Sequence, residues 1–376
     1  MLTRNPVATI SPEFSTWKTL TDSAKGELFG QSLRYWQTQC RQSLGLPTDK
    51  PIVIVGHQPT FFHPGILAKF IAANRLVQEI DGVLVYLVVD HHKGNVGILK
   101  TPEQDIEIAT ILPDVEMNDQ PRVEIINDIE PFSSALRKAE GENAAIQFAN
   151  ALVQLMSPWA NVHHVITASE LLHSGFGNAV VSEMQSNPRS CIDAYNSAVE
   201  AYPDSHVATL EDGELPLWKT NNALHPRALL LTLLARLVAC DLFVHGTGGR
   251  TYDRAMECWC NAWLGCSPCN TVMATATVRL QTEFKTVTDA RREYFSPSFD
   301  EQTKEEYLKS IDGAPYKSPR RQTQFQNMHR WLDSVQPTLD MDTLKRNEEI
   351  AQKRNWAFPL YTVKQLNSLC ELINTT

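Results

Sequence analysis

The sequence, 376 residues long, predicts an α/β protein with a parallel-sheet core and an appended helical C-terminal region. Short apolar segments, of the kind that a parallel sheet buries on both faces, alternate with longer segments of helical periodicity. The strand-like segments are residues 52–55, 83–89, 162–167, 241–246 and 269–280. We expect residues 1–282 to form the core with its insertions. Residues 283–376 are more charged and contain no strong strand, so we expect a mostly helical region there.

The first elements predict a β-α-β unit. A helix is expected over residues 16–44, before the β-branched strand at 52–55. Residues 66–80 carry apolar side chains at helical spacing, which predicts a helix with one buried face. Gly82 ends this helix, and VLVYLVV at 83–89 follows as a second buried strand. A right-handed parallel crossover is the default for two such strands.

The later elements follow in order. Residues 100–131 alternate acidic and β-branched residues and predict either a hairpin or an irregular insertion. A helix is expected over 132–156, and further helices between the strand at 162–167 and about residue 201. Asp212-Gly213 lies between two extended stretches, as in a hairpin turn. Residues 225–239 begin beside a proline and are apolar nearly all round, so we expect a buried helix there.

Composition indicates a globular protein of the cytoplasm. A net charge of −9 leaves no basic surface for nucleic acid, so we expect no such partner. The longest apolar stretch is broken by Arg236, so we expect no membrane span. Residues 1–14 lack the apolar stretch of a signal peptide, and the eight cysteines are then expected to be reduced thiols. The oligomeric state stays open, with a homodimer as one alternative.

The first candidate site follows strand 52–55, in the segment GHQPTFFHPG. It contains Gly56, His57, Gln58, His63 and Gly65, with Lys69 one helical turn further on. Ligands of parallel sheets bind at the carboxyl ends of strands, where helix N-termini offer N–H groups. The segment therefore predicts a site for a phosphate or carboxylate. The alternative is a turn whose histidines only cap backbone groups.

The second candidate site is Asp90-His91-His92-Lys93-Gly94-Asn95, which leaves strand 83–89. A carboxylate beside an imidazole can orient it and raise its basicity, as a general base requires. Asp90 and His91 are therefore candidate catalytic residues, together with His57. A metal is the less favoured alternative because only one carboxylate is present. We assign no metal ligands.

The third candidate site follows strand 241–246 in the segment FVHGTGGRTYD. His245 and Gly246 end this strand, Gly248 and Gly249 form the turn, and Tyr252 lies in the first turn of a helix expected over 251–264. Such a glycine turn makes a nest of N–H groups suited to an anion. Its glycine spacing matches neither the dinucleotide nor the P-loop pattern. Together the three segments predict one pocket for a small anionic metabolite.

A group of four cysteines and Arg227 are two further candidates for a functional role. Cys258, Cys260, Cys266 and Cys269 have a spacing similar to a zinc site, and Cys266-Ser-Pro-Cys269 has the spacing of redox motifs. Residues two apart on a helix point in different directions, so buried reduced thiols are the favoured interpretation. Arg227 starts the buried helix and could bind an anionic ligand or cap a neighbouring carbonyl; we favour the ligand.

Three segments together resemble the bacillithiol synthases, the enzymes assigned to add cysteine to a glucosamine–malate conjugate. GHQPTFFHPGILAKF resembles their first glutamine- and glycine-bearing turn, and VYLVVDHHKG is similar to their strand with an acid-and-histidine cluster. ALHPRALLLTLLARLVACDLFVHGTGGRTYD resembles their later helix, strand and glycine turn. His63-Pro64-Gly65-Ile66 is also similar to the nucleotide-binding HIGH motif, with Ile66 at its last position.

This resemblance implies a Rossmann-like core similar to nucleotidyltransferases and class I synthetases. It also implies a ligase or transferase that joins an amine to a small anionic metabolite. Gly56, Gln58 and Gly65 would then line the first turn, and Asp90 with His91 the second. The sequence leaves the cofactor open, with a nucleotide as one alternative. The alternative function is a non-catalytic protein that binds a nucleotide or another anion on the same fold.

Overall fold

The computed structural model describes residues 6–220, 223–280, 287, 301–335 and 341–376. It divides into two compact units, the first comprising residues 1–278 with 355–376 and the second residues 279–354. We expected one helical region over 283–376, whereas the last helix of the chain belongs to the first unit. Residues 281–286 and 288–300, at the expected boundary, lie outside the described residues.

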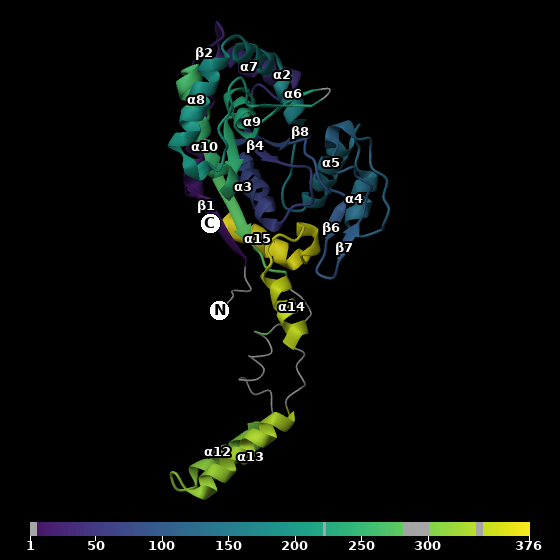
Figure 1. Cartoon of the computed structure of the whole chain (residues 1–376), viewed down its shortest axis with the longest axis vertical. Helices are drawn as coiled ribbons and strands as arrows, with labels where there is room; N and C mark the ends of the chain where they lie inside the picture. Colours follow the sequence, from purple (N-terminus) through teal and green to yellow (C-terminus); the bar gives the residue numbers. More distant parts are fainter. Residues whose placement is uncertain (1–5, 221–222, 281–286, 288–300, 336–340) are drawn as a thin grey trace. The chain divides into compact units, whose positions relative to one another are not determined.

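The first unit is built on a six-stranded sheet with the order β1-β12-β11-β4-β5-β8. Figure 1 labels β1, β4 and β8 of this sheet. Five strands run parallel, and β1 pairs with β12 in antiparallel register at one edge. In chain order, the parallel strands β4, β5, β8, β11 and β12 are arranged 3-2-1-4-5, which is the order of a Rossmann-like half sheet. The predicted α/β fold class is confirmed. The strands are β1 (Val7–Ser11), β4 (Ile52–His57), β5 (Val83–Val88), β8 (His164–Thr167), β11 (Leu242–His245) and β12 (Thr271–Thr277).

Helices cover both faces of this sheet. Alternate residues of β4 and β5, such as Ile54 and Val85, join one large apolar cluster with the helices of one face. These helices are α2 (Leu33–Ser43), α6 (Ala168–Leu172), α7 (Gly175–Ser186), α8 (Pro188–Ala201), α9 (Ala228–Leu234) with the π-helical turn η4 (Ala235–Ala239), and α10 (Thr247–Leu264). On the other face Phe70 of α3 (Pro64–Ile80) meets Tyr86 of β5 edge to face at 5.2 Å. Because helices cover both faces, the central residues of β4 and β5 are apolar on both sides of the sheet.

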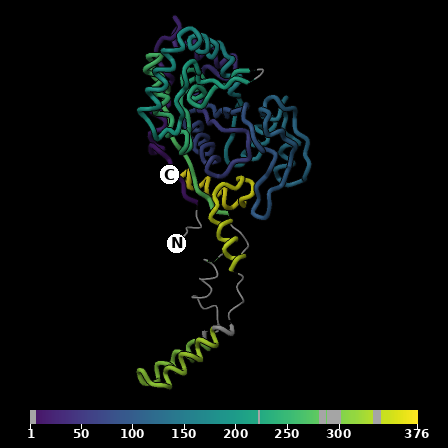
Figure 2. The backbone as a smooth tube through the Cα atoms, viewed as in Figure 1, coloured from purple at the N-terminus to yellow at the C-terminus, as the bar shows by residue number. Residues whose placement is uncertain are grey.

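The two ends of the described chain meet on the first unit. The C-terminal helix α15 (Val363–Thr375) packs against α3 and β1, as the adjacent yellow and purple segments of Figure 2 show. Arg75 of α3 donates a 2.8 Å hydrogen bond to the carbonyl of Ile373. The short helices α1 (Trp17–Leu20) and η5 (Phe358–Leu360) lie beside this layer. This packing explains why residues 355–376 belong with the sheet.

An insertion between β5 and β8 has a small core of its own. It contains the hairpin β6 (Ile98–Lys100) and β7 (Asp105–Glu107), the turn η2 (Met117–Asp119), and helices α4 (Phe132–Lys138) and α5 (Ala144–Met156). Phe132 and Phe148 are fully buried there against Phe61. The hairpin alternative expected for 100–131 is therefore partly realised, and the helix expected over 132–156 is two helices separated by Ala139–Asn143.

Two local expectations were wrong. The helix expected over 16–44 is interrupted by the two-stranded ribbon β2 (Glu27–Leu28) and β3 (Gln31–Ser32), where Phe29 and Gly30 have positive φ. The hairpin is not at Asp212-Gly213 but pairs β9 (Leu217–Lys219) with β10 (Leu224–Pro226). In the first case turn residues outweigh the apolar spacing, and in the second, within the described residues, the turn at Asp212-Gly213 forms without paired strands on either side of it.

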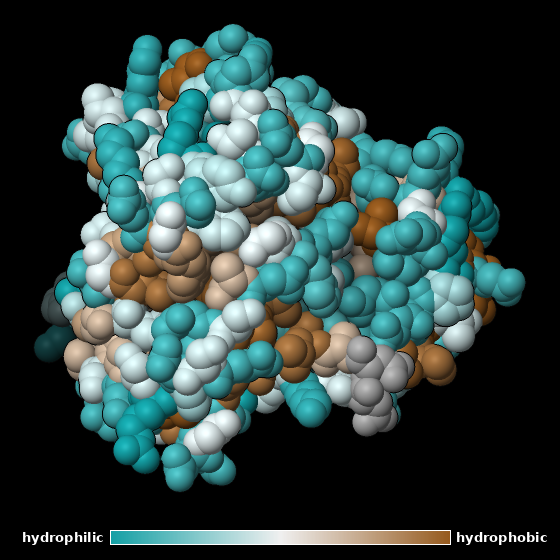
Figure 3. Space-filling model, turned by 90° about the horizontal axis from the view of Figure 1, so that it is seen from above, coloured by the Kyte–Doolittle hydropathy of each residue, from teal (hydrophilic) through white to brown (hydrophobic). Residues whose placement is uncertain are grey.

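The second unit contains the helical hairpin α12 (Glu301–Asp312) and α13 (Pro319–Val335), and helix α14 (Met341–Gln352). None of the helices in the described ranges is both long and apolar enough to cross a membrane. On the face in Figure 3, hydrophilic residues predominate and hydrophobic residues show between them in small groups.

Candidate functional site

The order of the parallel strands creates a topological switch point between β4 and β11. These neighbours are the first and fourth parallel strands of the chain, and their crossovers leave in opposite directions along the sheet. Ligands of open α/β sheets bind outside the carboxyl ends of the strands at such a point. Here β4 ends at His57 and β11 ends at His245. The first and third predicted segments therefore meet, as expected.

Lys69 is the charged side chain that reaches this point. It lies on α3, is only 4% exposed, and its Nζ donates a 2.8 Å hydrogen bond to the carbonyl of Gly56. Its Cδ is 3.8 Å from the place where a Cβ on Gly246 would lie, so the stem also contacts the exit of β11. Burial lowers the pKa of Lys69 to about 7. A buried amine that is so easily deprotonated is characteristic of functional sites.

The N-terminus of α10 follows β11 directly. Gly246 is its N-cap and has no side chain to accept from the first N–H groups, which belong to Thr247, Gly248 and Gly249. A Cβ on Gly249 would lie 2.1 Å from Nδ1 of His245, whereas a Cβ on Gly248 would meet nothing within 4 Å. Gly249 thus permits close packing against His245, and Gly248 leaves the helix end open. Such an end favours an anion.

A buried ion pair between Arg236 and Asp253 lies beside His245. Oδ1 of Asp253 accepts a 2.8 Å hydrogen bond from Nη1 of Arg236 and lies 3.3 Å from Nε2 of His245. Burial by itself would raise the pKa of Asp253, but the hydrogen bond from His245 and the charges of His245 and Arg236 lower it overall. Asp253 is therefore an anion that orients His245.

The exit of β4 has two histidines with different roles. His57 Nδ1 lies 3.0 Å from the carbonyl of Gln58, and burial, then the charge of Lys69, lowers the pKa of His57 to about 3. A neutral imidazole cannot attract an anion by charge, which corrects the expected role. His63 is the N-cap of α3, where its Nδ1 accepts from the N–H of Gly65. His63 thus caps a backbone group, as the alternative interpretation proposed.

Gly65 and Gln58 support this exit through their backbones. A Cβ on Gly65 would lie 2.7 Å from the carbonyl oxygen of Ala276, so only glycine lets α3 approach β12 this closely. The carbonyl of Gln58 accepts a 3.0 Å hydrogen bond from the hydroxyl of Tyr86. Both residues therefore shape the turn through backbone atoms, and these contacts give neither residue a role in binding a ligand.

Asp90, at the exit of β5, is engaged by protein groups on both carboxylate oxygens. Oδ1 accepts from the N–H of Ser169 at 3.1 Å, and Oδ2 accepts from Nδ2 of Asn118 at 3.2 Å. Burial would raise the pKa of Asp90, but the nearby His91 and the hydrogen bond from Ser169 lower it overall. An anion with a lowered pKa is a poor proton acceptor, so Asp90 orients its neighbours.

His91 stacks on His225, a residue of β10 that sequence reasoning did not select. The two ring centroids are 4.9 Å apart and the ring planes differ by 21°. Nδ1 of His91 lies 3.8 Å from Asp90 Oδ1. Burial, followed by the charge of His91, lowers the pKa of His225, and both of its ring nitrogens are without a hydrogen-bond partner among the described residues. These nitrogens are free to accept a proton from a ligand, and the lowered pKa makes His225 a weaker base than an ordinary histidine.

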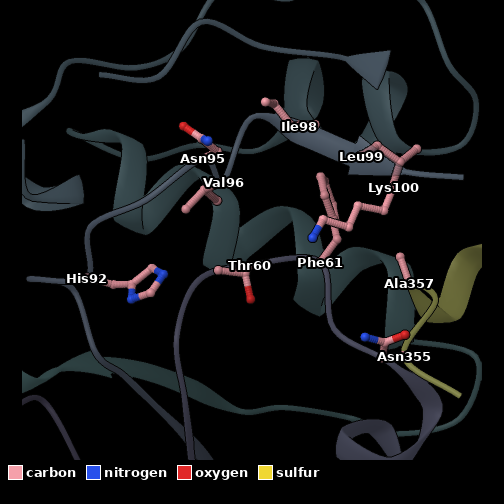
Figure 4. Close-up of a pocket in the computed structure, with 10 residues that line it drawn as sticks. All are labelled: Thr60, Phe61, His92, Asn95, Val96, Ile98, Leu99, Lys100, Asn355 and Ala357. Atoms are coloured by element: carbon pink, nitrogen blue, oxygen red, sulfur yellow. The ribbon is translucent and has the colours of Figure 1, made fainter. Parts of the chain in front are cut away.

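A cavity of about 220 Å³ opens beside the exits of β4 and β5, and Figure 4 shows its lining. None of the described residues at the β11 exit lines this cavity, so it does not join the three predicted segments in one pocket. Thr60 and Phe61 come from the β4 exit and His92 from the β5 exit, while the β6 segment and the chain before η5 close the other side. In Figure 4 the Lys100 side chain extends back toward Thr60. The lining is Thr60, Phe61, His92, Asn95, Val96, Ile98, Leu99, Lys100, Asn355 and Ala357.

The remaining predicted residues are engaged elsewhere. Arg227 is the N-cap of α9, forms an ion pair with Glu214, and places its guanidinium 4.1 Å from the ring centre of Trp218. Its charge is therefore already paired. Tyr252 meets the ring of His245 edge to face at 5.8 Å, and burial raises the pKa of its hydroxyl. Tyr252 thus packs beside the switch point.

Sequence reasoning missed three members of this region. His225 begins the segment 225–239, in which the sequence drew attention only to Arg227. Lys100 and Asn355 reach the cavity from a hairpin and from a segment far along the chain, and no local pattern marks them. In the described part of the chain, no three or more His, Cys, Asp or Glu side chains are grouped to hold a metal ion.

Comparison with known proteins assigns no family. No family model matches the sequence, and no curated protein matches it significantly. Among solved structures, the tyrosyl-tRNA synthetase of Archaeoglobus fulgidus, complexed with L-tyrosine, is 12% identical with a TM-score of 0.31 and aligns over 96% of each chain. The tryptophanyl-tRNA synthetase of Plasmodium falciparum is 8% identical with a TM-score of 0.29, over 96% of this chain and 95% of that one. Likenesses this low do not identify a function.

Proposed function

We propose that the protein is a ligase or transferase that joins an amine to a small anionic metabolite. The observation that carries the proposal is the meeting of Lys69, Gly56 and the open N-terminus of α10 at the switch point of the sheet. Helix N–H groups and a buried amine together favour a phosphate or carboxylate. The neighbouring cavity is large enough for a metabolite of modest size.

The anionic group binds at the N-terminus of α10 in this proposal. A ligand anion beside Lys69 would favour the protonated amine, because an opposite charge raises the pKa of a lysine. Lys69 would then neutralise negative charge that develops during the reaction. His245 is held by Asp253 at the same end of β11 and would donate to the ligand or orient it. A nucleotide phosphate would fit this end as well as a substrate carboxylate.

The amine is deprotonated at the exit of β5 in this proposal. His91 or His225 is the candidate base, since Asp90 has both oxygens engaged and a lowered pKa. The negative charges of Asp90 and Glu116 near His225 would attract an ammonium group. The hydrogen bond from Val89 N–H to the carbonyl of His57, at 3.1 Å, keeps the two exits adjacent.

The alternative is a non-catalytic protein that binds a nucleotide or another anion at the same place. The engaged carboxylate of Asp90 favours this alternative, because the expected acid–base pair is then incomplete. One experiment separates the two. Purified protein is incubated with pooled small amines, small carboxylates and ATP, and amide products are sought by mass spectrometry.

The catalytic proposal expects a new product that disappears with Lys69→Met and with His225→Phe. If no combination yields a protein-dependent product, while anions still raise the melting temperature of the wild type and not of Lys69→Met, the protein binds without catalysis. If neither product nor stabilisation is found, both proposals are wrong.

A further inference from the structure

Two cysteines lie side by side at the C-terminal end of α10, opposite the end that faces the switch point. Sγ of Cys260 is 3.7 Å from Sγ of Cys266, and Cys260 also donates to the carbonyl of Cys266 at 3.3 Å. Gly265, with φ of +69°, ends the helix and turns the chain back over its last turn. The turn thus places the two thiols in contact.

A second pair lies close by in the same core. Cys240 follows η4, Cys269 precedes β12, and their sulfurs are 3.6 Å apart. The two cysteines of the C-x-x-C motif therefore belong to different pairs: Cys266 contacts Cys260, and Cys269 contacts Cys240. The fold has therefore paired cysteines that are 6 and 29 residues apart.

The pairs differ in how a reagent can reach them. Cys266 is the most exposed of the four at 7%, Cys269 is 3% exposed, and Cys240 and Cys260 are fully buried. The hydrogen bond from Cys260 lowers the pKa of Cys266 even though burial opposes this, and burial raises the pKa of Cys240 well above its ordinary value. The thiolate is the reactive form of cysteine, so Cys266 is the reactive member of the four.

We propose that Cys266 and Cys260 form an oxidisable dithiol site, which a hydroperoxide converts to an intramolecular disulfide while Cys240 and Cys269 stay reduced. In the first step the Cys266 thiolate attacks one oxygen of hydrogen peroxide, the O–O bond breaks, and hydroxide leaves. In the second step Cys260 sulfur attacks the Cys266 sulfenic acid, the S–O bond breaks, and water leaves with the Cys260 proton. The two sulfurs lose two electrons, and peroxide gains them.

The contact at 3.7 Å makes Cys260 the resolving thiol. A disulfide bond is about 2.05 Å long, so the sulfurs need to approach by less than about 2 Å. The loop that this bond closes spans only the end of α10, and the turn at Gly265 can absorb the movement without disturbing the sheet. This inference is independent of the proposed ligase or transferase activity.

The test is peptide mapping of the full-length protein after titration with hydrogen peroxide. Remaining thiols are alkylated after unfolding, and disulfide-linked peptides are identified by mass spectrometry. We expect loss of two hydrogens and a single link between Cys260 and Cys266, reversed by dithiothreitol. Cys260→Ser should leave a sulfenic acid on Cys266 that dimedone traps. Cys269→Ser is the matched control and should leave the link unchanged.

Two outcomes would overturn the proposal. One is a link between Cys240 and Cys269 that forms first. The other is oxidation confined to the half-buried cysteines, Cys258 and Cys370, with Cys266 unmodified. The wild-type map decides between these results, so the test does not depend on the folding of a variant.

Discussion

Lys69 Nζ donates a 2.8 Å hydrogen bond to the carbonyl of Gly56, and this contact joins α3 to the end of β4 at the switch point of the sheet. The stem of the same side chain lies against Gly246 at the N-terminus of α10. A single buried amine thus contacts both strand exits that border the switch point.

Stability should depend on pH through Lys69. Its pKa is about 7 in the folded protein and near the ordinary value of 10.5 in the unfolded chain. Between these values the unfolded chain holds a proton that the folded chain has released, so the free energy of unfolding rises with pH, by at most about 1.4 kcal/mol per unit. Chemical denaturation from pH 7 to 10 measures this slope. Lys69→Met should have a flatter profile, and an equal slope in both proteins would contradict the assignment.

Anion affinity should fall as pH rises through about 7, because Lys69 then loses its charge. Sulfate is a suitable probe since its own charge does not change in this range. Calorimetric titration at pH 6 and pH 8.5 should show weaker binding at the higher pH for the wild type. Lys69→Met should bind weakly at both. Equal affinity at the two pH values in the wild type would mean that Lys69 does not contact the anion.

Gly249→Ala should destabilise the protein, whereas Gly248→Ala should not. A Cβ on Gly249 would meet the His245 ring at 2.1 Å, so the ring must move, at a cost of about 1–3 kcal/mol. Gly248 faces open space, and its substitution should change stability by less than about 0.5 kcal/mol. Urea denaturation compares the two variants. Similar losses in both would show that the close contact with His245 is not the cause.

Arg236→Met should be among the most destabilising single changes in the core. Arg236 is 1% exposed, and its loss leaves the Asp253 carboxylate buried without its guanidinium partner, at a cost of about 3–5 kcal/mol. Glu257 is the half-exposed partner of the same guanidinium, so Glu257→Gln should cost less than about 1 kcal/mol. Thermal unfolding of both variants tests the difference. A loss with Glu257→Gln that matches Arg236→Met would contradict a buried pair with Asp253.

His225→Phe should separate stability from activity. Both ring nitrogens of His225 are buried without a described partner, so a phenyl ring of similar shape should leave the free energy of unfolding unchanged within about 1 kcal/mol, or raise it. If His225 is the base, product formation falls while folding is retained. Unfolding curves and product assays on the same preparation give both quantities. A large loss of stability would instead assign His225 a structural role.

The candidate site could be predicted in part. The segments after residues 55, 89 and 245 were identified because a buried β-branched strand followed by glycine and polar residues marks a strand exit. Strand order decides that the exits of β4 and β11, with His57 and His245, lie side by side. It also decides that Lys69 contacts both exits. No sequence pattern shows that β4, the first parallel strand of the chain, lies between β5 and β11. Arg227 is a case in which the sequence was misleading. Its position before a buried helix suggested a ligand-binding role, whereas in the structure it forms an ion pair with Glu214.

Apolar periodicity in the sequence is enough to predict the fold class, the parallel strands and the helix over 66–80, because it reports burial directly. Tertiary structure alone decided which side chains meet. The stacking of His91 on His225, the orientation of His245 by Asp253 and the pairing of Cys260 with Cys266 join segments whose approach depends on turns and strand order. Local propensity contains no information about such contacts, since they arise only when the chain packs against itself.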